Sequence, residues 1–208
     1  MDLNNAFSLM IDTSNNAKLN DIKELVSGQS DITRIYGVIL YTDRNPYVKK
    51  VLRDDDFWAA LDEISGIRWP IFAVRPKRQI ESSKSLRQPK MVSTGNAPQS
   101  NTLLLEDFGI DDINMLPLFV AFIWDNEGVL KQVHVPIEGN DMDSVYHSLE
   151  TTIKTIADAE EGILEENRDT IHVFREVKSS LVAQNTRTSI RKTINSIKQI
   201  KDIVDLFR

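Results

Sequence analysis

Hydrophobic residues along the first 157 positions fall into two kinds of pattern. Short continuous runs rich in β-branched and aromatic residues predict strands at residues 6–11, 35–41, 69–74 and 116–124. Apolar residues spaced three and four apart predict helices at 19–26, 46–64 and 141–156. The 35–41 run is apolar at nearly every position, which is typical of a strand buried on both faces. The alternation predicts an α/β fold.

Polar residues mark the ends of these elements. Asn45 is a predicted N-cap, with Pro46 at the first helical position. The cluster Asp54–Asp56 is a candidate break in the 46–64 helix, and Asp56 is a candidate cap for its second half. A strand, a helix and a strand of these lengths predict a parallel pair with a right-handed crossover.

The second half of the pattern predicts an antiparallel hairpin. The turn Asn126-Glu127-Gly128 separates the 116–124 strand from an alternating strand at 129–135. Asn140 or Asp141 is then expected to cap the 141–156 helix. Before the hairpin, residues 103–107 predict a short helix that Gly109 ends.

Two segments depart from the α/β pattern. Residues 77–101 hold two prolines and five serines but few large apolar residues, so we expect a polar, mobile insertion within a domain spanning 1–159. Residues 160–208 continue at helical spacing only, which predicts an all-helical extension. Its wide apolar stripe is costly to leave in water. The stripe can pack on its own domain or on a partner, and the pattern does not decide between them.

Composition removes one class of chemistry. The chain has no cysteine, so disulfides, thiolate catalysis and thiolate metal sites are excluded. The start of the chain does not resemble a secretory signal, and no apolar run is long enough to span a bilayer, so we expect a cytoplasmic protein without membrane attachment. The net charge is −6, yet basic residues gather at 75–90 and 178–208, as in a solvated surface or a site for an anionic partner.

The order of elements resembles the thioredoxin-like fold. In that family a buried strand runs into a Trp-Cys-Gly-Pro-Cys loop that opens a helix. Here residues 38–42 run into Asp43-Arg44-Asn45-Pro46-Tyr47, and Pro46 matches the family proline. The family's cis-proline, strand, glycine turn and strand correspond to Leu116-Pro117 and the segments that follow it. This resemblance covers about 150 of the 208 residues and implies a mixed sheet flanked by helices.

The resemblance implies binding rather than thiol chemistry. Arg44 and Tyr47 stand where the family has cysteines, so no redox activity carries over. What carries over is a groove that receives an extended partner segment by strand addition. Its residues here would be Arg44, Asn45, Pro46, Tyr47, Leu116 and Pro117. We therefore expect a non-catalytic protein-binding or assembly subunit without a cofactor, in which residues 160–208 mediate oligomerisation or partner docking.

Two other hypotheses belong to different classes. One is a metal-assisted hydrolase that uses Asp43, Asp54, Asp55 and Asp56. The other is a nucleic-acid-associated subunit that uses the basic 75–90 segment and the C-terminal helix; the acidic remainder of the chain argues against it. The pair Asp143 and His147 has helical spacing but lacks an obvious further ligand, so a surface pair is favoured over a metal site. A bacterial stress or defence role is a guess that no residue supports.

Overall fold

A computed structural model of the chain describes residues 9–11, 19–26, 35–65, 69–74, 102–163 and 169–187. Within these ranges the strands are β1 (Leu9–Ile11), β2 (Tyr36–Leu40), β3 (Ile71–Val74), β4 (Leu118–Trp124) and β5 (Leu130–Pro136). The helices are α1 (Leu19–Val26), α2 (Pro46–Val51), α3 (Asp55–Ser65), α4 (Thr102–Asp107), the 3-10 turn η1 (Ile113–Met115) and α5 (Met142–Glu161). Residues 170–187 form a further helix, called here the C-terminal helix.

The described strands form one mixed sheet in the order β1-β3-β2-β4-β5. β3 lies between β1 and β2 and runs parallel to both, which confirms the predicted strand–helix–strand unit. β4 is antiparallel to β2, and β5 is antiparallel to β4, which confirms the predicted hairpin. The α/β class expected from the hydrophobic pattern is therefore correct.

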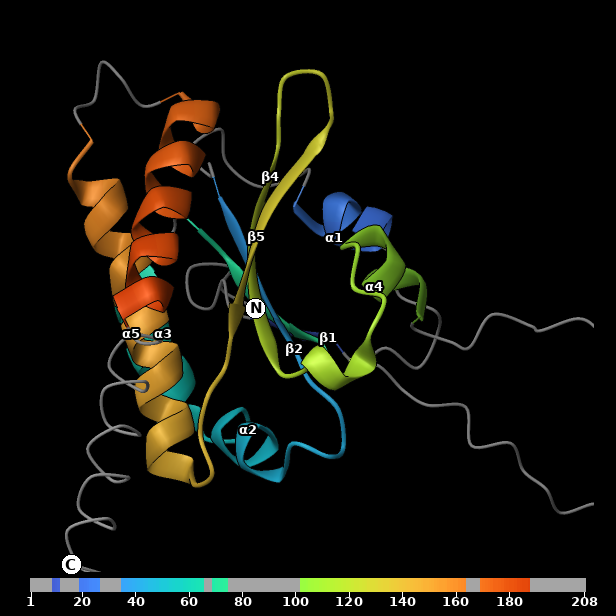
Figure 1. Ribbon diagram of the computed structural model, residues 1–208, viewed down its shortest axis with the longest axis vertical. Coiled ribbons are helices and arrows are strands. Elements are labelled where there is room, and N and C mark those ends of the chain that lie inside the picture. The colour runs from blue at the N-terminus through green and yellow to red at the C-terminus, as the bar shows by residue number, and fades with distance from the viewer. Residues whose placement is uncertain are drawn as a thin grey trace, which may run out of the picture.

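Helices cover both faces of the sheet (Figure 1). Alternate residues of each central strand point into two separate apolar clusters: in β4, Phe119 and Ala121 enter one, and Val120 and Phe122 the other. α2, α3, α5 and the C-terminal helix complete the first cluster, and α1 and α4 complete the second. Burial on both faces explains why the central strands are apolar at nearly every position.

The predicted 46–64 helix is broken into α2 and α3, as the acidic cluster suggested. The cap is a different residue from the one expected, however. The Asp54 side chain accepts a hydrogen bond from the backbone nitrogen of Asp56 at 3.1 Å, so Asp54 caps α3, and Asp56 lies inside it. The indole nitrogen of Trp58 donates to the Leu52 carbonyl at 2.9 Å and ties the two helices together.

The C-terminal helix packs on the chain's own core. Val173, Phe174, Val177 and Leu181 are buried in the same cluster as the inner face of α5. This part of the apolar stripe is therefore covered within the chain. The rest of the predicted helical extension, residues 188–208, and the whole 77–101 insertion lie outside the described residues. No helix in the described part is both long and apolar enough to cross a membrane.

Candidate functional site

A pocket lies where the ladder between β2 and β4 ends. Leu40 pairs with Leu118 in the last row of that ladder. Hydrogen-bonded rows of an antiparallel pair recur every second residue, so Thr42 and Leu116 would form the next one. Instead, the backbone nitrogens of both residues bond within their own loops. The two residues line a cavity of about 260 Å³ together with Asp43, Arg44, Asn45, Ile113 and Asn114.

One wall of the pocket is the loop from Thr42 to Asn45. The Asn45 side-chain oxygen accepts from the Thr42 backbone nitrogen at 2.9 Å and from its hydroxyl at 3.0 Å. The Thr42 hydroxyl oxygen in turn accepts from the Arg44 backbone nitrogen at 3.3 Å. Asn45 stands at the N-cap position of α2, as expected, but its side chain makes no capping bond to the helix. The predicted N-cap position is therefore confirmed, while the side-chain oxygen bonds to Thr42 and not to the helix.

The other wall is the turn that precedes β4. Asp112 caps η1 through its carboxylate, which accepts from the backbone nitrogen and from the side-chain nitrogen of Asn114, both at 2.8 Å. Leu116 then leaves the turn in an extended conformation, with φ −73° and ψ 143°. Its bond to Pro117 is cis, a point that the sequence left open.

The main chain at Leu116 is only partly available for strand addition. Its N–H donates to the Ile113 carbonyl at 3.3 Å, a long bond by the usual standards of protein hydrogen bonds. The next carbonyl, that of Pro117, accepts from the Ile137 backbone nitrogen at 3.0 Å. Among the described residues, the Leu116 carbonyl accepts no backbone hydrogen bond.

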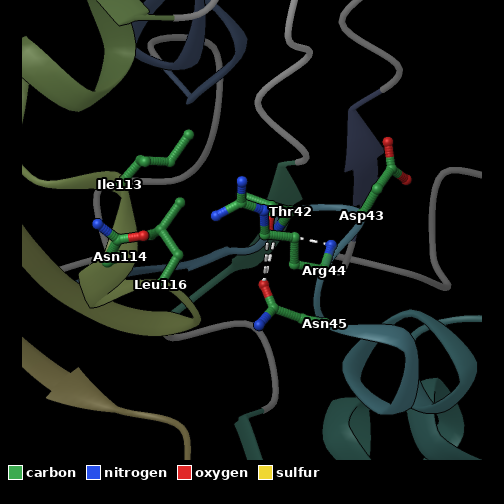
Figure 2. A pocket seen from close by; sticks show the side chains of 7 residues that line it. All are labelled: Thr42, Asp43, Arg44, Asn45, Ile113, Asn114 and Leu116. Carbon is green, nitrogen blue, oxygen red and sulfur yellow. Dashed lines mark hydrogen bonds between the residues drawn. The ribbon is translucent and has the colours of Figure 1, made fainter.

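Charge in the pocket is concentrated on one side chain. Asp43 and Arg44 are the charged residues of the lining, and Asp43 pairs with Lys49 at 3.4 Å. Figure 2 shows the Arg44 guanidinium directed toward the wall that carries Ile113 and Asn114, while the Asp43 carboxylate points away from it. The pocket therefore presents a positive group to any occupant.

Three of the six residues proposed from the sequence line this pocket: Arg44, Asn45 and Leu116. The other three adjoin them in the chain. Pro46 is the first residue of α2, Tyr47 is 38% exposed with the Lys50 ammonium 5.7 Å from its ring centre, and Pro117 precedes β4.

Thr42, Ile113 and Asn114 were not among the residues proposed for the groove. Their place follows from the pairing register of β2 and β4, and no local sequence motif marks them.

Two of the four residues of the hydrolase hypothesis make other contacts. Asp43 pairs with Lys49, and Asp54 caps α3. Nowhere in the described part do three histidine, aspartate or glutamate side chains gather in a way that could hold a metal ion. His147 lies 3.8 Å from Glu150, as a surface pair along α5. Most of the basic segments of the nucleic-acid hypothesis lie outside the described residues.

Comparison with known proteins gives no family assignment. No family model matches the chain, and neither a curated protein nor a solved structure matches it. Function is therefore argued from the pocket itself.

Proposed function

We propose that this chain is a non-catalytic protein-binding subunit on a thioredoxin-like frame, and that the pocket between the Thr42–Asn45 loop and Leu116 receives an extended partner segment. The observation that carries the proposal is the early end of the β2–β4 ladder. The walls separate there beside Leu116, whose backbone is extended and whose carbonyl accepts no backbone hydrogen bond among the described residues. Strand addition uses main-chain groups of this kind.

Two further features support the same proposal. The β2–α2 loop and the segment before Pro117 lie at the same end of the sheet, as the resemblance leads us to expect. Because the chain has no cysteine, this end of the sheet has no thiol nucleophile. Recognition through main-chain groups does not need one. A thioredoxin-like frame with these properties is suited to binding.

Assembly through the tail is the second part of the proposal. Because residues 173–181 are covered by the chain's own core, we assign self-association or docking to the part of the tail after residue 187. There the sequence repeats isoleucine at 190, 194 and 197. Light scattering of the full chain and of a chain ending at residue 187 tests this. The same number of subunits in both chains would remove the self-association role.

Binding at the pocket is tested with peptides displayed from a random library and selected on the full chain. We expect selected peptides to lose binding to an Asn114→Trp variant, because the indole occupies the pocket. Asn126→Trp is the matched control, since Asn126 is also exposed but lies in the hairpin between β4 and β5, at the opposite end of the sheet. The bound peptide is recovered and its molecular mass is measured by mass spectrometry. A changed mass would show catalysis, and loss of binding in both variants or in neither would place the site elsewhere.

A further inference from the structure

In the part of the chain that the structure describes, the Arg44 guanidinium has no anionic partner. Among the described residues no carboxylate lies within ion-pair distance of it, whereas Asp43 is paired with Lys49. Figure 2 places its guanidinium between the two walls of the pocket. An arginine offers five hydrogen-bond donors and no acceptor. An occupant that matches this group must therefore supply acceptor oxygens.

The backbone that carries Arg44 is fixed. Its nitrogen donates to the Thr42 hydroxyl oxygen at 3.3 Å, and that hydroxyl donates to the Asn45 side chain at 3.0 Å. The side chain is exposed, but its starting point is set by the loop. Fixing the backbone lowers the entropy lost when the guanidinium engages a ligand.

Two apolar residues line the pocket together with the charged group. Ile113 and Leu116 line the pocket, and Met115 between them is 51% exposed. A cation beside exposed apolar side chains fits a ligand that has an anionic group next to an apolar one.

We infer that the pocket selects an aspartate or glutamate side chain of the partner segment, with a large apolar neighbour lying on Ile113 and Met115. The inference rests on the proposed function and adds the chemistry of the bound side chain. A planar carboxylate matches the guanidinium with two parallel hydrogen bonds. The side chain is taken to be internal to the partner segment, because the proposed function has an extended segment lying beside Leu116 rather than ending there.

The test uses a library of 12-residue peptides displayed between two fixed flanks, so that no free carboxyl terminus is present. We expect peptides selected on the full chain to carry an acid at one position beside a large apolar residue. Arg44→Gln should weaken the strongest peptide about tenfold or more, as should replacing the peptide's acid by its amide. Making both changes together should cost little more than one, because the two groups interact.

Arg44→Glu should change the selected residue from an acid to lysine or arginine. Arg53→Glu is the matched control, since Arg53 is an exposed arginine in the α2–α3 junction and outside the lining. It should leave the selected sequences unchanged. Selected peptides that bind the full chain and lose binding to Asn114→Trp, yet share no acidic position, would overturn this inference and leave the proposed function standing. Peptides that need a free carboxyl terminus would also overturn it. Failure to select any pocket-dependent peptide would overturn both the proposed function and this inference.

Discussion

Asn45 accepts two hydrogen bonds from Thr42 through one side-chain oxygen, at 2.9 Å from the backbone nitrogen and 3.0 Å from the hydroxyl. This pair closes the loop between β2 and α2, and it turns Thr42 away from the row that it would otherwise share with Leu116. The pocket therefore depends on a side chain that acts as a loop clamp rather than as a helix cap or a ligand.

Removing the clamp should open this loop. Asn45→Ala leaves the partly buried Thr42 nitrogen without its acceptor, which should lower the free energy of unfolding by about 1 kcal/mol. Asn45→Asp retains an acceptor and is the control. Denaturant unfolding measures the stability, and amide exchange at Thr42 measures the opening. Unchanged exchange at Thr42 in the alanine variant would contradict the clamp.

Gly37 should tolerate no side chain. A Cβ there would lie 2.7 Å from Cζ of the buried Phe119 ring and 3.1 Å from Ile71. Gly37→Ala should therefore lower the free energy of unfolding by about 1–3 kcal/mol, the usual cost of overpacking. Gly162→Ala is the matched control, because its φ is −67° and a Cβ there would lie 3.5 Å from the Asp158 carbonyl oxygen, an ordinary contact distance. Equal stability of the two variants by chemical denaturation would contradict this packing.

The neighbours Leu181 and Val182 test whether the C-terminal helix belongs to the core. Leu181 is fully buried and Val182 is 49% exposed. Leu181→Ala should lower the free energy of unfolding by about 2–5 kcal/mol, as buried leucines do. Val182→Ala should change it little. Similar small effects at both positions would mean that the helix does not pack on its own chain in solution.

His134 should make the fold sensitive to mild acid. Burial lowers the pKa of His134 from its usual 6.5, while the Phe108 carbonyl raises it by a smaller amount. Its buried Nε2 has no hydrogen-bond partner among the residues that the structure describes. The unfolded chain then binds the proton more readily, so stability is complete above pH 6.5 and falls as the pH drops through that value toward the folded pKa.

His134→Gln should reduce this loss of stability. Thermal melts between pH 7.5 and about 5 measure the slope. The control is His147→Gln, because the His147 side chain is 80% exposed. A slope that survives in His134→Gln would assign the acid sensitivity to other groups.

Periodicity was sufficient to predict the strands and the helices between them, because burial on both sheet faces imposes apolar runs and helix packing imposes spacing. It could not choose among neighbouring polar groups. Each of three consecutive aspartates could cap α3, and the structure has Asp54 rather than Asp56 in that role. The Asn45 side-chain oxygen can accept from Thr42 or from the first backbone nitrogens of α2, and it bonds to Thr42.

The pocket needed information that no local pattern contains. Ile113 and Asn114 enter it because of the register between β2 and β4, which pairs residues far apart in the chain. The C-terminal stripe shows the same limit. Its spacing specified an apolar face, but only the three-dimensional packing shows that residues 173–181 are covered by the α5 side of the core.

The most direct test of the central claim is an amide NMR titration of the full chain with the strongest pocket-dependent peptide. The account predicts that the largest shifts fall on Thr42, Arg44, Asn114 and Leu116, with little change at the opposite end of the sheet around Asn126. Shifts centred on the free edge of β5 or on the exposed face of the C-terminal helix would contradict it.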